Sequence, residues 1–349
     1  MRTVTGAILA MNLEVKDFVH RDVEEADRRL REIGARKILL QLPDGLKPYA
    51  FDYFTYLSQR YDVILSSSPV YGACDIGPSY LYDRVDAIVQ VGHSIMRNVK
   101  YPRPVIFIEH YRTVDVEDIN TEALKNYRRI GLIYSIQYRP VADRVKRILE
   151  SKGFEVIIGR SDRRMTYDGQ VLGCNFSSVH SVEAEVEAFV IVSTGSFHAL
   201  GSQISTERPV FLLDLNEMSL RSMEKEADTF IRKRYAQIYR AMDAKRICFL
   251  VDTRIGQRRE KLARMLMDRA RDLGKEAVLA YTDNISDQDI QNMGCDLAVY
   301  TGCPRVPIDD QDRFTVPVLT PAEFSMAFFK SSKRYVLDEI VSVDEFTDQ

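Results

Sequence analysis

The sequence predicts an α/β protein made of three similar small domains, each with a parallel four-stranded sheet, arranged around a central site. Short continuous apolar runs alternate with helical patterns, which is typical of parallel strands buried on both faces. The same succession of runs occurs three times along the chain. A length of 349 residues also exceeds that of one ordinary domain. The three repeats therefore set the expected architecture.

The first two strands of each repeat flank a helix. The first strands are expected at 37–44, 129–134 and 245–251, and the second at 61–65, 153–158 and 274–279. Between them we expect helices at 141–152 and 257–273, whose apolar residues fall on one helical face. Gly153 and Gly274 stand where a helix end favours glycine.

Each repeat continues with a third apolar run that ends in a glycine loop, and then a fourth that follows a proline. The third runs are 86–94, 188–198 and 296–303, and the prolines are Pro104, Pro209 and Pro317. The expected domains are 1–117, 118–243 and 244–349, with a charged, amphipathic linker helix at 217–243. Ligands of open parallel sheets bind beyond the carboxyl ends of the strands. Three domains that turn these ends inward would form one central site.

Three cysteines lie far apart in the chain, each in a loop that contains glycine. Cys74 follows Tyr71-Gly-Ala, Cys174 follows Leu172-Gly, and Cys303 follows Thr301-Gly. Such cysteines are often small buried hydrophobic residues, but loops at strand ends favour a shared metal site. Zinc would normally have a CxxC pair or histidines at short spacing. Three thiolates with one open position suit an iron–sulfur cluster.

The other two cysteines have a different context. Cys248 lies inside the strand expected at 245–251, and Cys295 lies just before the next strand, so both are expected in the core. An odd number of cysteines in a large chain favours a reducing cytosol and metal-binding or catalytic thiols.

Two histidine loops at strand ends are candidates for ligand contact. One contains His93 with Ser94, and the other contains Gly195, Ser196 and His198. A serine beside a histidine suggests acyl transfer, but the GxSxG pattern of such enzymes is absent. The remaining histidines, His20, His110 and His180, have weaker contexts.

The segment Asp252 to Arg258 follows the first strand of the third repeat and opens the expected helix. Backbone N–H groups at a helix start, together with Arg254, Gln257 and Arg258, suit a carboxylate or phosphate. The Walker lysine pattern and GxGxxG are absent, which argues against a nucleoside triphosphate. A capped helix with a solvated basic face is the alternative.

The overall composition excludes several classes of function. A formal net charge of −3 provides no general attraction to nucleic acid, so no direct nucleic-acid binding is expected. The first 18 residues lack the features of a signal peptide, and no apolar run approaches the length of a membrane span. A cytoplasmic protein with no membrane partner is the expectation.

Taken in order, these motifs resemble the archaeal diphthamide-biosynthesis transferases, across nearly the whole chain. The matching segments include Pro43-Asp-Gly-Leu46, the three cysteine loops, Val91-Gly-His93-Ser94, Gly195-Ser-Phe-His198-Ala-Leu-Gly201 and Asp252-Thr-Arg-Ile-Gly-Gln257-Arg258. The resemblance implies a 4Fe–4S cluster held by Cys74, Cys174 and Cys303, with S-adenosylmethionine at the fourth iron. It also implies a homodimer.

The activity that the resemblance implies is the first step of diphthamide biosynthesis. A 3-amino-3-carboxypropyl radical, formed from S-adenosylmethionine, would attack C2 of a histidine in translation elongation factor 2. An electron-donor protein or reductant would be required. The methionine carboxylate is expected at the Arg254–Arg258 segment. Two alternatives are a 4Fe–4S dehydratase similar to quinolinate synthase and a non-catalytic partner subunit of the transferase.

Overall fold

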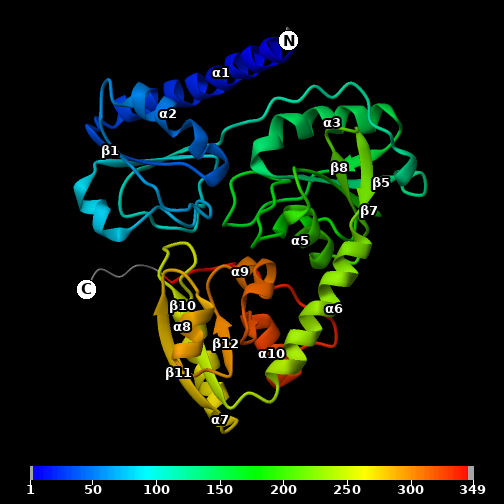
Figure 1. Ribbon diagram of the computed structural model, residues 1–349. Coiled ribbons are helices and arrows are strands. Elements are labelled where there is room, and N and C mark those ends of the chain that lie inside the picture. Colours follow the sequence, from blue (N-terminus) through cyan, green and yellow to red (C-terminus); the bar gives the residue numbers. More distant parts are fainter. Residues whose placement is uncertain (1–2, 345–349) are drawn as a thin grey trace. The chain divides into compact units, whose positions relative to one another are not determined.

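The computed structural model describes residues 3–344 and confirms an α/β fold with three sheets (Figure 1). The chain forms two compact units. Unit 1 extends to Ile95 and includes Lys100–Tyr111, whereas unit 2 comprises Met96–Val99 and the chain from Arg112 onward. Unit 1 contains one sheet and unit 2 contains the other two. The three-domain boundaries at 117/118 and 243/244 remain a prediction.

Unit 1 contains four parallel strands in the order β2-β1-β3-β4. They are β1 (Lys37–Gln41), β2 (Asp62–Leu65), β3 (Ala87–Val91) and β4 (Val105–Ile108). The accompanying helices are α1 (Thr3–Glu32), η1 (Asp44–Tyr49), α2 (Ala50–Leu57) and η2 (Ser79–Arg84). α1 contains His20, around which the sequence indicates a charged helix. Its buried residues recur at helical spacing and pack in one core with β1, β3 and β4: Val19, Val23, Ala26 and Leu30.

The first sheet of unit 2 has five strands in the order β6-β5-β7-β8-β9. They are β5 (Arg129–Tyr134), β6 (Glu155–Ile157), β7 (Ala188–Val192), β8 (Val210–Asp214) and β9 (Ser219–Ser222). Its helices are η3 (Glu122–Leu124), η4 (Ile136–Tyr138), α3 (Arg139–Ser151), α4 (Ser177–His180) and α5 (Phe197–Ser205). Alternate residues of β7 enter two separate cores, so this sheet is buried on both faces as predicted.

The fifth strand corrects the expected linker helix at 217–243. β9 pairs antiparallel with β8, and the helix α6 spans only Glu224–Ala241. The carboxylate of Asp214 accepts hydrogen bonds from the N–H groups of Asn216 and Glu217, at 2.8 and 3.2 Å. This turn reverses the chain, because short side-chain acceptors of this kind stabilise turns rather than helices.

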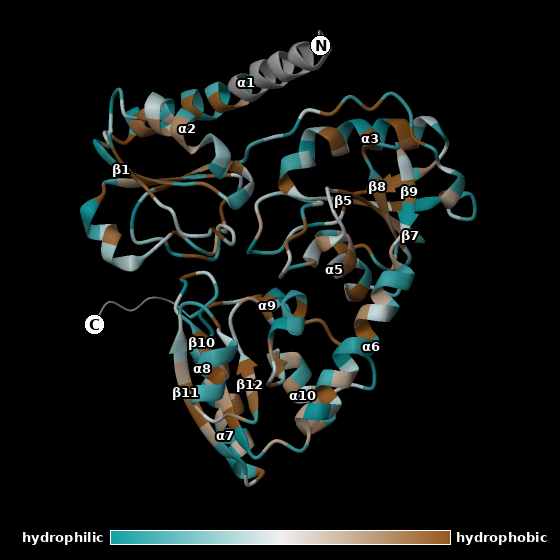
Figure 2. Cartoon of the chain, in the orientation of Figure 1, coloured by the Kyte–Doolittle hydropathy of each residue, from teal (hydrophilic) through white to brown (hydrophobic). Residues whose placement is uncertain are grey.

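The second sheet of unit 2 again has four parallel strands, in the order β11-β10-β12-β13. They are β10 (Arg246–Asp252), β11 (Glu276–Thr282), β12 (Leu297–Tyr300) and β13 (Val318–Leu319). Its helices are α7 (Glu260–Asp272), α8 (Asp287–Asn292), α9 (Arg305–Asp309), η5 (Gln311–Arg313) and α10 (Pro321–Phe329). Figure 2 shows hydrophobic residues along β10 and β12. The first four strands of every sheet share one order, which confirms the repeat.

The predicted helix ends are correct, but one predicted start is wrong. Gly153 and Gly274 follow α3 and α7 with φ of +91° and +74°, the left-handed region that suits glycine. The helix expected from residue 257 begins at Glu260 instead. Residues 254–258 form a separate turn, in which the N–H groups of Gln257 and Arg258 both donate to the carbonyl of Arg254. Arg259, with φ of −131° and ψ of 56°, is not helical and separates this turn from the helix.

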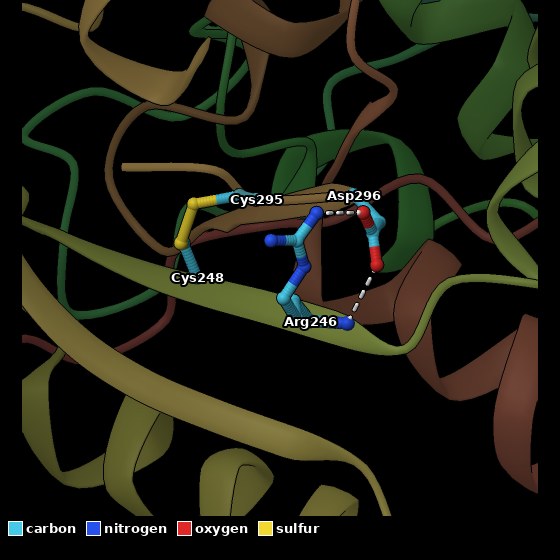
Figure 3. Close-up of a disulfide and its surroundings, with 4 residues drawn as sticks. All are labelled: Arg246, Cys248, Cys295 and Asp296. Atoms are coloured by element: carbon cyan, nitrogen blue, oxygen red, sulfur yellow. Dashed lines mark hydrogen bonds and ion pairs between the residues drawn. A yellow bond between two sulfur atoms is a disulfide. The ribbon is translucent and has the colours of Figure 1, made fainter. Parts of the chain in front are cut away.

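Cys248 and Cys295 lie in the core as expected, and they also form a disulfide (Figure 3). This bridge is not evident from the sequence, because 47 residues separate the two cysteines. The pairing of β10 with β12 places Cys248 opposite Ala298 and brings Cys295 to a Cα–Cα distance of 5.9 Å. Beside the disulfide, Arg246 pairs with Asp296 at 3.0 Å.

A fully buried ion pair joins α6 to α10. Both side chains of Arg234 and Glu323 have no exposed surface, and two guanidinium–carboxylate contacts of 2.7 Å connect them. Arg234 also donates to the carbonyls of Pro307 and Val318. Glu323 additionally closes a capping box with Thr320 at the start of α10.

No helix within residues 3–344 has the length and apolar character to span a bilayer.

Removing one member of this pair should strongly destabilise unit 2. Glu323→Ala leaves a buried guanidinium without its carboxylate, a loss expected to cost about 3–5 kcal/mol. Urea unfolding should show this decrease, whereas Arg232→Met, at an exposed position on the same helix, should leave the free energy of unfolding within about 0.5 kcal/mol of the original. A loss below about 1 kcal/mol for Glu323→Ala would contradict a structural role for the pair.

Candidate metal centre

Cys74 occupies a loop that two side chains of unit 1 hold in place. The loop follows β2, and Cys74 itself is only 6% exposed. The side-chain amide of Gln90, on β3, donates to the carbonyl of Asp75 at 2.7 Å. The hydroxyl of Tyr101 donates to the carbonyl of Ala73 at 3.0 Å. Both carbonyls adjoin Cys74, so the thiol sits on a loop with a defined path.

His93 and Ser94 directly follow β3 of the same sheet. Burial lowers the pKa of His93 to about 4, so the imidazole is neutral at neutral pH. Its Nδ1 is buried without a hydrogen-bond partner among the described residues. Gly92, with φ of +89°, turns the chain here. A Cβ at this position would lie close to the ring of Pro43. A neutral imidazole with unused hydrogen-bonding capacity therefore lies at the carboxyl edge of the first sheet.

Cys174 lies in a narrow turn of unit 2 and is 8% exposed. The N–H of Leu172 donates to the carbonyl of Asn175 at 3.0 Å and closes the turn. The Asn175 amide donates to Asp162 at 2.7 Å. The carbonyl of Cys174 accepts a hydrogen bond from the N–H of Ile340 at 2.9 Å. The C-terminal segment of the described chain thus fixes this turn from the other side.

Cys303 lies in the loop after β12. Residues next to it in that loop pack against the Cys174 loop. The N–H of Cys303 donates to Oε1 of the buried Gln257 at 3.1 Å. Burial, followed by the charge of Cys174, raises the pKa of Cys303 to about 12. Convergence of Cys174 and Cys303 on one metal centre remains a prediction.

The two cysteine loops of unit 2 pack tightly against each other. A Cβ at Gly173 would lie 2.7 Å from the Phe197 ring and 3.1 Å from Cγ of Arg305. The guanidinium of Arg305 stacks on the Phe197 ring at 4.0 Å and pairs with Asp309 at 2.9 Å. Gly173 precedes Cys174, and Arg305 follows Cys303 by two residues. A glycine at 173 is required because no other residue permits this approach.

The second histidine loop lies next to the same arginine. Burial, with a further contribution from the charge of Arg305, lowers the pKa of His198 to about 4. Nδ1 of His198 is 3.4 Å from Oγ of Ser193, at the end of β7. Gly195 and Ser196 are exposed just before α5. His198 is thus positioned near the cysteines, and the roles of Gly195 and Ser196 remain predictions.

The Asp252–Arg258 segment is largely engaged in internal contacts. Asp252 is fully buried, binds Arg254 at 2.9 Å and accepts a hydrogen bond from Tyr300. Arg258 pairs with Glu260 at 2.8 Å. The Lys261 N–H, in the first turn of α7, donates to the carboxylate of Asp344 at 3.0 Å. Within this segment, the side chain of Gln257 contacts the Cys303 loop, and substrate contact by the segment stays a prediction.

Arg164 also lies beside Cys174, and the sequence does not reveal it as a site residue. This side chain has no exposed surface, and its Nη2 donates to the carbonyl of Gly256 at 2.9 Å. The same nitrogen lies 3.9 Å from Sγ of Cys174. In the sequence, Arg164 is one of two adjacent arginines in a polar loop, and no pattern distinguishes it from the exposed Arg163.

The thiols present fit a metal cluster, but unit 2 supplies only two of them. Among residues 3–344, no three His, Cys, Asp or Glu side chains form a group that could hold a metal ion by itself. Cys174 and Cys303 supply soft thiol groups, with the cationic Arg164 beside Cys174. Cys74 belongs to unit 1, and its part in a shared cluster remains a prediction.

Comparison with known proteins identifies the family. Residues 42–336 match the family described as "Putative diphthamide synthesis protein". The chain belongs to this diphthamide synthesis family. It is 32% identical over 330 residues to the 2-(3-amino-3-carboxypropyl)histidine synthase of Pyrococcus horikoshii, covering 92% of this chain and 94% of that protein. The synthase subunit 1 of Encephalitozoon cuniculi is 27% identical over 319 residues, covering 89% of this chain and 88% of that protein.

A solved structure of the diphthamide synthesis family has the same fold. The crystal structure of Dph2 from Pyrococcus horikoshii with a 4Fe–4S cluster superposes with a TM-score of 0.82 at 32% identity. The match covers 94% of this chain and 96% of that one. These relatives favour the transferase interpretation of the sequence over the alternative of a quinolinate-synthase-like dehydratase.

Gly173→Ala should separate the two cysteine loops. The added methyl group meets the Phe197 ring at 2.7 Å, and overpacking of this kind costs about 1–3 kcal/mol. The metal-free variant should lose cross-linking of Cys174 to Cys303 by a short bifunctional thiol reagent, as mapped by peptide mass spectrometry. Adding Phe197→Ala should restore it. Gly45→Ala is the control, because a Cβ there meets nothing within 4 Å. Unchanged cross-linking in Gly173→Ala would contradict the packing argument.

The lowered pKa of the partly buried His198 should make the protein less stable in acid. Its pKa of about 4 lies below the 6.5 of an exposed imidazole, so the unfolded chain takes up the proton first as the pH falls. The stability present above pH 6.5 is therefore lost progressively toward pH 4. His198→Gln should reduce this decline in the free energy of unfolding, whereas His20→Gln, at an exposed position, should not. Equal declines for His198→Gln and the unchanged protein would refute this assignment.

Proposed function

We propose that this protein transfers the 3-amino-3-carboxypropyl group of S-adenosylmethionine to C2 of a histidine in translation elongation factor 2, the first step of diphthamide biosynthesis. One observation carries the proposal. The loops that carry Cys174 and Cys303, from two different sheets, pack together through Gly173, Phe197 and Arg305. They do so in a chain whose fold matches, over 94% of its length, a Dph2 structure that contains a 4Fe–4S cluster.

We further propose that Cys74, Cys174 and Cys303 hold a 4Fe–4S cluster in this chain. When bound, such a cluster supplies one electron and one iron not ligated by cysteine, where S-adenosylmethionine would bind. Without metal, the raised pKa keeps the Cys303 thiol protonated at neutral pH. Cluster binding must therefore release this proton, which makes assembly more favourable at higher pH.

Other residues of the chain would bind and orient the substrate. His93 and His198 are neutral at neutral pH, so each can hydrogen-bond a polar group without adding charge. The side-chain oxygen of Gln257 accepts the backbone N–H of Cys303 and so holds that loop. The proposed contacts to S-adenosylmethionine are His93, Ser94, Gly195, Ser196, His198, Asp252, Arg254, Gln257 and Arg258. The methionine carboxylate would be met by Arg254 or Arg258, since the first turn of α7 already binds Asp344.

The reaction also requires partners. Elongation factor 2 supplies the histidine, and an electron-donor protein or a chemical reductant supplies the electron. The relative from Encephalitozoon cuniculi is named as subunit 1, which supports assembly with a second chain. We propose a homodimer that acts in the cytoplasm, where elongation factor 2 works.

The three loop cysteines should each be necessary for the cluster. Cys74→Ala, Cys174→Ala and Cys303→Ala should each reduce iron and sulfide content after anaerobic reconstitution, because each change removes a thiolate ligand. Reduced enzyme with S-adenosylmethionine should yield methylthioadenosine, and these variants should yield none. The control is Cys248→Ala/Cys295→Ala, which removes the disulfide but no proposed ligand. Full iron content in a variant lacking all three loop cysteines would refute the cluster.

A further inference from the structure

Arg164 is the exception among the buried arginines of the described chain. Arg234, Arg259 and Arg305 are each paired with a carboxylate, at 2.7, 2.6 and 2.9 Å. Arg164 is fully buried and has no such pair. Its Nε and Nη1 are buried without a hydrogen-bond partner in residues 3–344. An unpaired buried charge with unused donors is costly, so its persistence calls for an acceptor that occupies the site.

The surroundings of Arg164 identify what kind of acceptor this is. The nearby carboxylate of Asp162 is already engaged, since it accepts the backbone N–H of Arg164 and the amide of Asn175. The carbonyl of Gly256 holds Nη2 at 2.9 Å and orients the guanidinium. The same nitrogen lies 3.9 Å from Sγ of Cys174. The group near Arg164 that can carry a negative charge is therefore the sulfur of Cys174.

We propose that Arg164 is a positioning residue that donates hydrogen bonds to the sulfur atoms of the cluster at Cys174 and raises its reduction potential. This inference rests on the proposed function. One-electron reduction, with the electron supplied by dithionite, makes the cluster more negative by one unit. A cation at a fixed distance in a buried site stabilises this reduced form more than the oxidised form. Hydrogen bonds to sulfur change the potential in the same direction.

The position of Arg164 also joins the two cysteine loops of unit 2. Its backbone belongs to the loop before Cys174, whereas its guanidinium is held by Gly256. The next residue, Gln257, accepts the N–H of Cys303. The Arg164 side chain therefore connects the two loops that surround Cys174 and Cys303. Its position depends on how these loops pack.

The test compares Arg164→Met and Arg164→Lys with the matched control Arg163→Met, which removes the same charge from the adjacent exposed position. Each protein is reconstituted anaerobically and its iron and sulfide are measured. The midpoint potential is then determined by a dithionite titration followed by absorbance and electron paramagnetic resonance. The affinity for S-adenosylmethionine is measured separately by equilibrium dialysis, so that a change in substrate binding is not mistaken for a change in potential.

The reduced cluster carries one more negative charge, so a cationic donor stabilises it more than the oxidised cluster. Arg164→Met should therefore weaken the affinity of the cluster for an electron about tenfold or more, which is about 59 mV toward more negative potential for a one-electron couple. Arg164→Lys should show a smaller shift, because it keeps the charge but loses the planar set of donors. Arg163→Met should match the unchanged protein.

Three results would overturn the inference. The first is an unchanged potential in cluster-loaded Arg164→Met. The second is an unchanged potential with weaker S-adenosylmethionine binding, which would assign Arg164 to the substrate. The third applies if Arg164→Met binds no cluster: a loaded Arg164→Lys with an unshifted potential and unshifted spectra would then exclude specific donation. Failure of the unchanged protein to bind a cluster would instead refute the proposed function itself, and this inference with it.

Discussion

The contact between Gly173, Phe197 and Arg305 is the constraint on which the rest of the candidate centre depends. Cys174 and Cys303 belong to different sheets, and no strand pairing connects those sheets. The two loops can approach only because position 173 has no side chain. Arg305 then fills the remaining space by stacking on Phe197. The approach of these loops is therefore a result of side-chain packing between them, and it is sensitive to a single methyl group.

Buried charges surround this contact, and most are locally neutralised. Arg234 with Glu323 ties α6 to α10, and Arg259 with Asp338 ties the turn before α7 to the C-terminal segment. The same segment also reaches Cys174 through the N–H of Ile340. These pairs are costly to break once formed, so they hold the loop-bearing elements of unit 2 in one arrangement. Arg164 differs from these arginines, because its buried guanidinium has no carboxylate partner among residues 3–344.

The two candidate histidine loops have a common electrostatic character. Burial keeps the imidazoles of His93 and His198 neutral well below neutral pH. The positive charge near Cys174 and Cys303 therefore comes from arginine, whose charge does not change with pH in the physiological range. A site for a cluster that cycles between two charge states benefits from such constancy. Within unit 2, thiols, a permanent cation and a neutral imidazole are thus supplied by separate loops at the carboxyl ends of strands.

The sequence by itself determined the strands, the order of the repeats and the loops that bear the three cysteines. These features depend on local patterns: apolar runs of strand length, glycine at helix ends and glycine beside cysteine. Tertiary structure alone decided the antiparallel strand β9, the start of α7 at Glu260 and the disulfide between Cys248 and Cys295. It also decided which arginine lies beside Cys174. Arg163 and Arg164 are adjacent and chemically identical, and only the packing of distant loops buries one and exposes the other.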